Sequence, residues 1–522
     1  MKPSHKWPPA SLAKTIQRHP VLRPLQRLRW AITLVAIVVI IILAIALGVG
    51  LGLGLGHTKK NASAYCSDEK TYQLDSITAP IRGHGNPGSA RTWNLSIDDT
   101  ESGYKQTIAG FGATVTDATV SSFSTQSNAT LKNLLKELMT DAGASFSLMR
   151  HTIGSSDLSS TAYTYDDNDG KVDESLSGFA LGSQGTAMAQ LLSQMKSLNP
   201  SLRIVGSSWS APGWMKLNGA LDGNTTNNNL NDGFLTSGGV GSTGYSNAFA
   251  QYFVKYIQAY QNFGVDIDAI TIQNEPLNSK SGYPTMYVYS NESAHLIGDY
   301  VAPALKKAGL ETSVWAFDDN TDSAYYPQDV VNYAGQYVKA VAWHCYASPA
   351  NWTVLTEFHN QNPDVEQYMT ECWTSESLNW TQAVQFTMGP LQNWANGVTA
   401  WTLGANQDAG PHLIGGCDSC NGLVTTNANA NYTLSISYYM IAQFSKFMPP
   451  GARVLQGNGS YTYPNGNGIQ SVASLNPDGS RTVVIENRFG NDIYVTADLS
   501  SGATWSGNIP ASSVTTWVLP SD

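Results

Sequence analysis

Strand and helix signals alternate eight times between residues 106 and 448, and this alternation restricts the fold more than any other feature of the chain. Short apolar, β-branched runs predict buried strands. These runs end at Asp117, Arg150, Ser207, Asn274, Phe317, His344, Glu371 and Leu403. Amphipathic stretches separate them, and the clearest places six side chains on one helical face: Phe249, Tyr252, Phe253, Tyr256, Ile257 and Tyr260. Eight such units in one run predict a closed (β/α)8 TIM barrel. An open doubly wound sheet is the alternative, but no glycine-rich phosphate loop supports it.

After residue 448 the hydrophobic pattern changes to a period of two. Apolar residues alternate with polar ones from Ile493 to Leu499, and Asn476–Gly479 has the composition of a tight turn. The pattern predicts a small antiparallel β-sandwich over residues 449–522. Residues 66–105 also have strand character and no helical stripe, so we expect them to complete the sandwich. The second domain is then built from both ends of the catalytic region.

The N-terminal segment has the pattern of a membrane anchor. Residues 1–30 contain seven Lys and Arg and no acidic residue, and residues 31–56 are uncharged. Such a stretch is long enough to cross a bilayer of about 30 Å, and it exceeds the roughly 7–15 apolar residues of a cleaved signal peptide. The flanking charges predict a cytoplasmic tail at 1–30, a transmembrane signal-anchor at 31–56 and a linker at 57–65, the topology of a single-pass type II protein. Cleavage near Ala62–Ala64 is the alternative.

Composition and acceptor sites favour an exported, carbohydrate-active protein. All nine Asn-x-Ser/Thr triplets follow the predicted span: Asn61, Asn94, Asn128, Asn224, Asn291, Asn351, Asn379, Asn431 and Asn458. Their placement indicates that the catalytic part is lumenal or extracellular. The net charge of -10 argues against a nucleic-acid partner. The chain has 14 Trp and 25 Tyr, whose aromatic faces can pack on the C–H faces of sugars. Only 13% of its residues are charged, which is typical of a surface that is polar without being ionic.

Two predicted strands each end in a single carboxylate. The stretch 267–276 delivers Glu275, and the stretch 366–372 delivers Glu371. In a parallel barrel the carboxyl ends of the strands hold the catalytic groups. Two carboxylates on separate strands are what glycosidic-bond hydrolysis requires. A Glu that ends an apolar parallel strand has few structural roles, so the pattern predicts a glycosidase.

Most of the five cysteines are expected to pair in an oxidising compartment. Cys417 and Cys420 form a CxxC, which is typical of a redox pair, half a zinc site or a local disulfide. A local disulfide is favoured because no second CxxC completes a zinc site. Cys345 and Cys372 follow the sixth and seventh predicted strands, which are neighbours in a barrel, so a disulfide between them is expected. Cys66 is left over.

The sequence predicts neither a metal site nor a cofactor. No His, Asp and Glu set occurs at ligand spacing. We interpret the acidic pair Asp166–Asp167 as surface or loop charge.

The two carboxylate segments resemble the signatures of glycoside hydrolase family 30. The segments are Asn274–Glu275–Pro276 and Thr370–Glu371–Cys372, and the family's barrels carry catalytic carboxylates on strands four and seven. Five further segments are similar to the family's pattern: Gly110–Asp117, Leu148–Asp157, Ser208–Lys216, Trp343–Tyr346 and Ser437–Phe447. The resemblance covers residues 66–522.

The resemblance implies a retaining double displacement. Glu371 is then the nucleophile and Glu275 the acid/base, which requires an ionised Glu371 and a protonated Glu275 in the resting enzyme. Unequal surroundings and mutual repulsion are the means of separating their pKa values. A carboxyl separation of roughly 5–5.5 Å is expected for retention, against about 6.5–9.5 Å for inversion.

The resemblance also implies roles for residues around the two carboxylates. Asn274 is expected to hydrogen-bond the sugar 2-hydroxyl, and Asp117, Trp209 and Trp401 to hold the non-reducing-side sugar. Arg150 is expected to keep a catalytic Glu charged. The remaining two expected site residues are His344 and Tyr346, beside the nucleophile.

These residues also have structural interpretations. The tryptophans pack equally well at a barrel rim, and Asp117 suits a helix cap. Arg150 and His344 can form structural ion pairs.

The loop 410–420 and the segment Trp343–Tyr346 look most like the branch of the family active on β-1,6-glucan, which is common in fungi. An endo-β-1,6-glucanase acting on cell-wall glucan is therefore the first prediction. A glucosylceramidase is the alternative, because an anchor also suits a lipid substrate. A β-xylanase and a non-catalytic carbohydrate receptor rank lower, the receptor because Glu275, Glu371 and Asn274 are all present.

Overall fold

The computed structural model describes residues 61–223, 228–235, 244–347, 350–372, 378–427 and 431–521. The predicted cytoplasmic tail, the span at 31–56 and the first residues of the linker lie outside these ranges. Within them, no helix combines the length and the apolar character needed to cross a bilayer.

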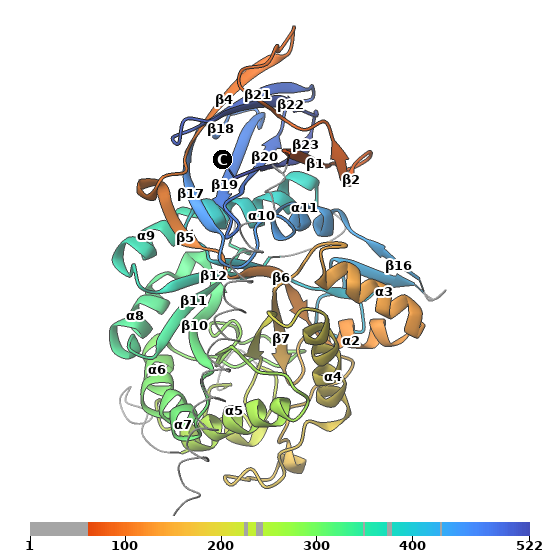
Figure 1. Ribbon diagram of the computed structural model, residues 1–522. Coiled ribbons are helices and arrows are strands. Elements are labelled where there is room, and N and C mark those ends of the chain that lie inside the picture. Colours follow the sequence, from red (N-terminus) through yellow and green to blue (C-terminus); the bar gives the residue numbers. More distant parts are fainter. Residues whose placement is uncertain are drawn as a thin grey trace, which may run out of the picture. The chain divides into compact units, whose positions relative to one another are not determined.

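Eight parallel strands close into a barrel, as the alternating pattern predicted (Figure 1). The strands are β6 (Gly110–Val115), β7 (Leu148–Ile153), β8 (Arg203–Ser208), β9 (Ala269–Thr271), β10 (Ser313–Asn320), β11 (Val338–His344), β12 (Glu366–Glu371) and β13 (Gly397–Ala400). They follow one another around the ring in chain order, and β13 pairs with β6 to close it. Every residue of β6 and β7 is buried, because side chains fill the barrel and helices cover its outside.

Helices surround the barrel. They are α2 (Asp117–Ser124), α3 (Asn128–Met139), α4 (Gly182–Leu198), α5 (Ser246–Gln261), α6 (Ser290–His295), α7 (Ala302–Lys307), α8 (Tyr325–Ala334), α9 (Thr353–Gln361), α10 (Trp380–Gln392) and α11 (Ile436–Ser445). A π-helical stretch, Leu296–Val301, joins α6 to α7. The stripe predicted for α5 is buried against the barrel. α10 begins at a capping box, in which Asn379 and Gln382 satisfy each other's backbone N–H groups. A small sheet not expected from the sequence comprises β14 (Gly404–Asn406), β15 (Val424–Asn427) and β16 (Asn431–Leu434).

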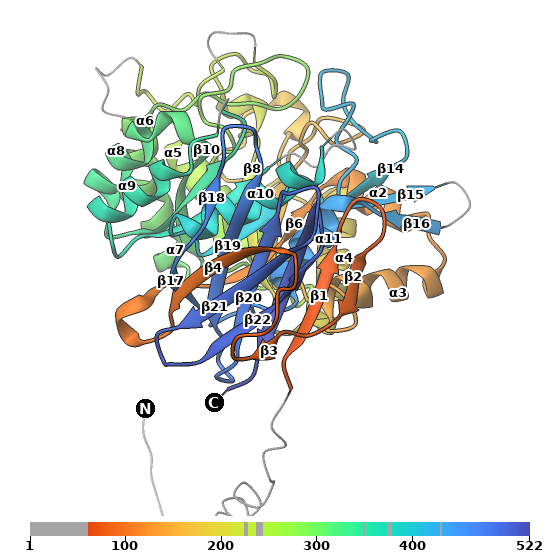
Figure 2. The ribbon, with the colours of Figure 1, turned by 90° about the horizontal axis from the view of Figure 1, so that it is seen from above.

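The second domain combines strands from both ends of the described chain. From the N-terminal side come β1 (Ser63–Ser67), β2 (Gln73–Ile77), β3 (Ile81–Arg82), β4 (Arg91–Asp98) and β5 (Tyr104–Thr107). From the C-terminal side come β17 (Arg453–Asn458), β18 (Tyr461–Thr462), β19 (Gly468–Leu475), β20 (Arg481–Asn487), β21 (Ile493–Leu499), β22 (Thr504–Ile509) and β23 (Ser513–Leu519). β1 lies beside β23, and β4 lies between β17 and β21 (Figures 1 and 2). β17 pairs with β19 through its first half and with β4 through its second, so it links the two layers.

Two details of this domain differ from the sequence prediction. The first strand begins at Ser63, inside the predicted linker 57–65, because Ala64 pairs with Trp517 at the other end of the chain. The sandwich is also not wholly antiparallel, since β4 and β21 run parallel from Arg91↔Ile493 onward. Alternation of apolar residues predicts a half-buried strand but not the direction of its neighbour.

Helices α10 and α11 lie between the barrel and the sandwich (Figures 1 and 2). The side chain of Gln385 in α10 donates to Glu486 at 3.0 Å. Gln443 in α11 is fully buried; it donates to Ser67 and accepts from Thr516. Polar groups buried at this junction are paired, so the two domains form one body rather than two loosely linked ones.

Candidate active site

The two predicted carboxylates face each other at the carboxyl end of the barrel. Glu371 is the last residue of β12, and Glu275 lies four residues beyond β9. A carboxylate oxygen of each lies within 4.8 Å of one of the other. Glu275 has a left-handed backbone (φ 44°), and its N–H donates to Asp318 O at 3.0 Å. That bond between neighbouring strand ends fixes the direction in which Glu275 points.

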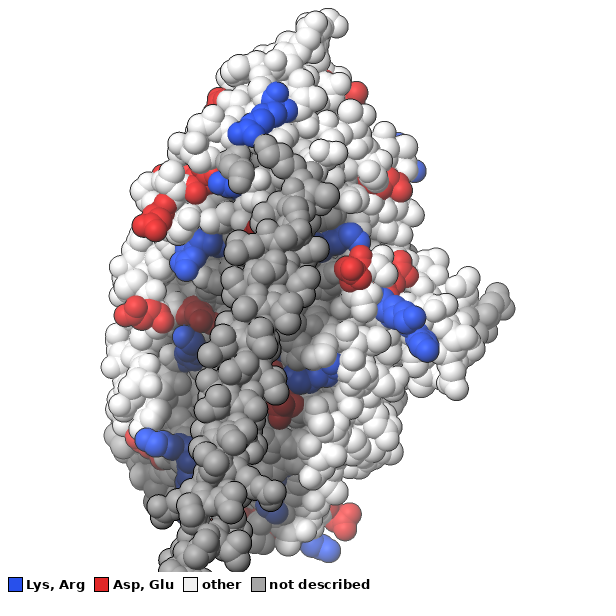
Figure 3. Space-filling model, viewed as in Figure 1, with Lys and Arg blue, Asp and Glu red and all other residues white. Residues whose placement is uncertain are grey.

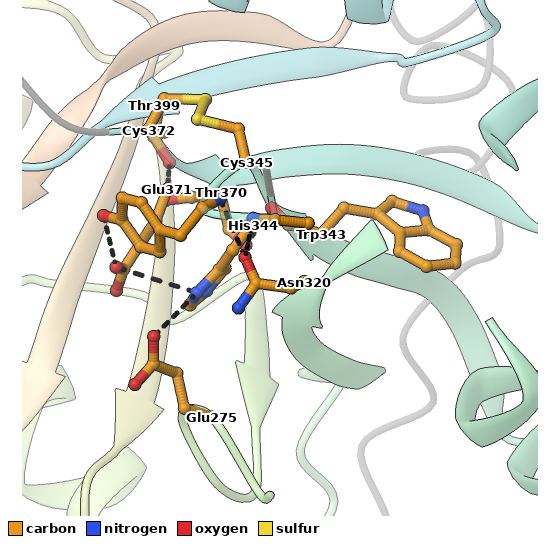
Figure 4. The surroundings of a disulfide bond; sticks show 11 residues. Glu275, Asn320, Trp343, His344, Cys345, Thr370, Glu371, Cys372 and Thr399 are labelled. Carbon is orange, nitrogen blue, oxygen red and sulfur yellow. Dashed lines mark hydrogen bonds and ion pairs between the residues drawn. A yellow bond between two sulfur atoms is a disulfide. The ribbon is translucent and has the colours of Figure 1, made fainter. Parts of the chain in front are cut away.

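His344, at the end of β11, lies between the two carboxylates (Figure 4). Its Nδ1 is 3.5 Å from Glu275 Oε1 and 3.7 Å from Glu371 Oε2, and its Nε2 is 3.1 Å from Asp318 Oδ1. Burial disfavours the charged imidazole, but Glu371, Asp318 and Glu275 outweigh this effect and raise the pKa of His344 to about 10. The imidazole is therefore a cation at neutral pH.

Arg150 supports the site from β7 and is completely buried. Its Nη1 donates to Glu371 at 2.6 Å, and its Nη2 donates to Asp318 at 2.9 Å and to Asn274 Oδ1 at 2.7 Å. Tyr346 adds a hydrogen bond to the other oxygen of Glu371 at 3.0 Å. Each oxygen of Glu371 thus accepts a hydrogen bond, which fixes the orientation of the carboxylate.

The expected roles require a higher pKa for Glu275, the acid/base, than for Glu371, the nucleophile. The directions of the two pKa shifts are the reverse of this order. Burial raises the pKa of Glu371, and the charge of Glu275 adds to this, while His344 and Arg150 oppose it. Burial acts in the same direction on Glu275, but hydrogen bonds from His344 and Asn278 outweigh it, and the pKa of Glu275 is lowered. His344 is therefore protonated at neutral pH and lies next to Glu275, whose pKa is lowered.

A cavity of about 600 Å³ opens above the carboxylates. Trp209 and Trp401 stack on each other in its wall, with ring centroids 5.4 Å apart, and Arg150 lies 5.0 Å from the Trp209 ring. Aromatic faces and several polar groups in one concave site suit a sugar. Of the residues expected at the site, Trp209, Asn274, Glu275, Tyr346, Glu371 and Trp401 line the cavity. Arg150 and His344 lie beneath it, in contact with the carboxylates.

Asp117 does not line this cavity. Its carboxylate accepts hydrogen bonds from Ser159 at 2.6 Å and Tyr163 at 3.1 Å, at the start of α2. These hydrogen bonds connect α2 to the loop after β7.

A different aspartate, Asp157, lines the cavity and was not selected from the sequence. Its Oδ2 accepts from Cys417 N at 3.3 Å, and its Oδ1 has no partner among the described residues. Burial and the charges of Glu371 and Glu275 raise its pKa to about 7. Asp318 was also missed, although it is fully buried and binds both Arg150 and His344.

Both predicted disulfides are present. Cys345–Cys372 joins the ends of β11 and β12, one residue beyond His344 and Glu371 (Figure 4). Cys417–Cys420 closes a loop at the rim of the cavity. The remaining cysteine is free and buried, as expected for Cys66.

Glu275, His344 and Glu371 form the one cluster of three His, Cys, Asp or Glu side chains among the described residues whose ligand atoms all lie within 4.8 Å of one another. On the face shown in Figure 3, charged side chains of both signs are interspersed over a mostly uncharged surface.

A buried carboxylate, Glu371, and a half-buried one, Glu275, across a sugar-sized cavity at the carboxyl end of a (β/α)8 barrel define a glycoside hydrolase. Family models bear this out: residues 108–448 match the family 30 TIM-barrel domain of glycosyl hydrolases, and residues 455–517 match the family 30 beta sandwich domain. The chain belongs to glycoside hydrolase family 30 and is a glycosidase.

Three relatives place it within the family. The chain is 69% identical over 464 residues to endo-1,6-beta-D-glucanase neg1 of Aspergillus fumigatus. The aligned residues make up 88% of this chain and 95% of that protein. It is 27% identical to the lysosomal acid glucosylceramidase of Mus musculus over 413 residues, 75% of this chain and 77% of the relative. Among solved structures, the endo-beta1,6-glucanase BT3312 superposes with a TM-score of 0.78 at 26% identity, covering 88% of this chain and all of the other.

Proposed function

We propose that this protein is a retaining endo-β-1,6-glucanase that acts on cell-wall glucan. The observation that carries the proposal is the distance of less than 4.8 Å between oxygens of Glu275 and Glu371. Inversion needs roughly 6.5–9.5 Å between the carboxyl groups to admit a water molecule, whereas retention needs about 5–5.5 Å. The substrate assignment is supported by the 69% identity with the Aspergillus fumigatus enzyme.

In the first step, Glu371 attacks the anomeric carbon and the glycosidic C–O bond breaks. Glu275 donates its proton to the departing sugar oxygen, so the leaving group departs as an alcohol and Glu371 carries the glycosyl ester. In the second step Glu275, now ionised, takes a proton from water while that water attacks the same carbon. The ester bond to Glu371 breaks, and Glu275 is protonated again.

His344 supplies the proton that Glu275 needs. The imidazolium carries the proton that Glu275 lacks. Transfer from His344 Nδ1 to Glu275 Oε1 crosses a single contact of 3.5 Å and leaves the net charge of the site unchanged. Arg150 and Tyr346 hold the Glu371 carboxylate in position until it attacks, and again after the glycosyl ester has been hydrolysed.

Asn274 is positioned to bind the sugar 2-hydroxyl. Its Oδ1 accepts from Arg150, so its NH₂ group is the part left to donate into the cavity. Trp209 and Trp401 provide the aromatic wall, and Asp157 adds an acceptor for sugar hydroxyls. Arg150 thus orients both the nucleophile and the amide that contacts the same sugar.

The test is hydrolysis of a linear β-1,6-glucan by the purified full-length protein, beside glucosylceramide and xylan. We expect release of short oligosaccharides from β-1,6-glucan at the highest kcat/KM, and loss of activity in Glu371→Gln. Glu366→Gln is the matched control, since Glu366 begins the same strand and pairs with Lys339 instead of the site. Preferential hydrolysis of glucosylceramide would replace the substrate assignment, and full activity in Glu371→Gln would remove the mechanism.

We also propose that the catalytic part is exported and that residues 31–56 attach it to a membrane. Two disulfides favour an oxidising compartment. Every glycan-acceptor asparagine that the structure describes is exposed. Sensitivity of the cellular protein to an N-glycosidase tests export, and resistance to alkaline carbonate extraction tests the anchor. A non-glycosylated protein in the soluble fraction would contradict both.

A further inference from the structure

The loop between β7 and α4, residues 154–181, contains a buried carboxylate, Asp166. Its side chain is only 2% exposed, and neither of its oxygens has a hydrogen-bond partner within the part of the chain that the structure describes. Among the described residues no Lys or Arg forms an ion pair with it; Lys255 donates instead to Leu176 O at 2.8 Å. Asp166 thus lies in a loop, as one form of the sequence interpretation has it, but its side chain is buried and not at the surface. A buried carboxylate without a donor is costly unless a proton or a cation neutralises it.

Two further side-chain oxygens lie with Asp166 around the position that a side chain on residue 178 would occupy. Residue 178 is glycine, so no side chain fills that position. Asp166 Oδ1, Asn168 Oδ1 and Asp173 Oδ2 lie 3.1, 3.2 and 3.4 Å from the position that a Cβ on Gly178 would occupy. Asn168 donates through Nδ2 to Lys171 O at 3.0 Å, which turns its Oδ1 toward the other two oxygens. Three acceptor oxygens thus surround the same position.

We propose that Asp166, Asn168 and Asp173 bind a Ca²⁺ ion. Hard divalent cations select carboxylate and amide oxygens, and Ca²⁺ accepts the irregular geometry and the water ligands that three side chains leave room for. Mg²⁺ requires closer, near-octahedral ligands and fits this arrangement less well. The two aspartates match the charge of a divalent ion, and Asn168 adds a neutral ligand.

The charges around the site agree with this assignment. Burial, together with the charges of Asp173 and Asp167, raises the pKa of Asp166 to about 6, and Lys255 opposes the shift only in part. Asp173 is held ionised, because the Gly178 N–H and the hydroxyls of Ser175 and Ser177 lower its pKa to about 2. At neutral pH both carboxylates are thus mostly ionised, and their two negative charges are available to balance a divalent ion.

The ion would connect two arms of the loop that borders the active site. Residues 166–168 form one arm and residues 173–178 the other. The same loop contains Asp157, which lines the cavity, and Tyr163, which donates a hydrogen bond to Asp117. Binding should therefore stabilise the fold and leave the chemical step little changed. With three protein ligands and a partly exposed site, we expect a Kd of about 10⁻⁴–10⁻³ M, the range of extracellular Ca²⁺ modules.

Terbium luminescence tests the proposal on the full-length protein after treatment with chelator. Trp214 Nε1 lies 2.8 Å from the backbone oxygen of Asp166, so excitation of Trp214 sensitises Tb³⁺ bound at the site. We expect a saturable signal that Ca²⁺ displaces, and a rise in Tm of about 2 °C or more at saturating Ca²⁺. Asp166→Asn should abolish the signal. Asp169→Asn should retain it, since Asp169 is exposed in the same turn and carries the same charge.

Two further variants make the outcome decisive. Gly178→Ala keeps every ligand and every charge but places a methyl group among the three oxygens, so we expect a weaker affinity by about ten-fold or more. Glu371→Gln removes a ligand of the catalytic cluster and should leave the signal unchanged. An identical Tb³⁺ midpoint in wild type, Asp166→Asn and Gly178→Ala, or a signal lost in Glu371→Gln, would overturn the proposal. So would a wild-type protein whose Tm does not respond to Ca²⁺.

Discussion

Replacing Arg150 by Met removes the cation on which the catalytic site is built. Arg150 donates to Glu371, Asp318, Asn274 and Ser207, and all of its side chain is buried. Breaking a buried ion pair from one side costs about 3–5 kcal/mol. Asp318 keeps donors from Ser207, Thr271, Thr370 and His344, so we expect the lower end, about 3 kcal/mol of unfolding free energy.

The same change should weaken catalysis. A hydrogen bond to a charged group contributes about 1.5–3 kcal/mol, so its loss from Glu371 corresponds to about a 10- to 150-fold decrease in kcat/KM. Urea unfolding followed by fluorescence measures the first effect, and hydrolysis of β-1,6-glucan measures the second. Both are expected to fall together in Arg150→Met.

Arg488→Met is the matched control. Arg488 makes two hydrogen bonds, at 2.8 and 2.9 Å, to Glu486, a buried carboxylate of the sandwich. We expect a comparable loss of stability with unchanged kcat/KM. An Arg150→Met protein that unfolds at the wild-type urea concentration and hydrolyses glucan at the wild-type rate would refute the reasoning.

Three further predictions follow from the site. The pKa of Asp157 is about 7 in the folded protein, against about 3.9 when unfolded, so between these values the native state holds the extra proton and its stability falls as pH rises. Asp157→Asn cannot ionise, so its Tm should exceed that of wild type above pH 7 and match it near pH 4; a constant difference across this range contradicts the assignment. Replacing Cys345 and Cys372 together by Ala opens a loop that spans 27 residues, so thermal or urea unfolding should show a loss of about 3–4 kcal/mol; an unchanged midpoint argues against the bridge. Asn274→Ala should lower kcat about 10- to 100-fold with little change in KM, because the bond to the 2-hydroxyl strengthens in the transition state; a rise in KM alone would assign Asn274 to ground-state binding.

The sequence was sufficient to predict the barrel and the proximity of Glu275 and Glu371, because both depend on local patterns. Each barrel strand is a short apolar run, and Glu275 and Glu371 follow such runs directly. A parallel barrel brings all strand ends to one face, so two residues 96 positions apart in sequence meet there. The disulfide Cys345–Cys372 was predictable for the same reason, since it links neighbouring strand ends.

Residues whose roles depend on distant contacts were missed. Asp157 lies in a polar loop, and its position is set by Cys417 and Gly416, about 260 residues away. Asp318 follows the predicted end of its strand at Phe317, but β10 continues to Asn320. Positive φ angles at Phe317 and Asp318 turn the Asp318 carboxylate into the barrel, and strand periodicity contains no sign of that change. Asp166 looked like surface charge because its burial results from packing of Trp214 and the loop around it.

The central claim is that Glu371 and Glu275 hydrolyse a glucosidic bond through a covalent intermediate. The most direct measurement is the anomeric configuration of the product, followed by ¹H NMR in the first moments of β-1,6-glucan hydrolysis, before mutarotation. Two displacements at one carbon predict that the β-anomer appears first and the α-anomer only as the sugar equilibrates. If the α-anomer appears first, a single displacement by water has occurred, and the account of the paired carboxylates is contradicted.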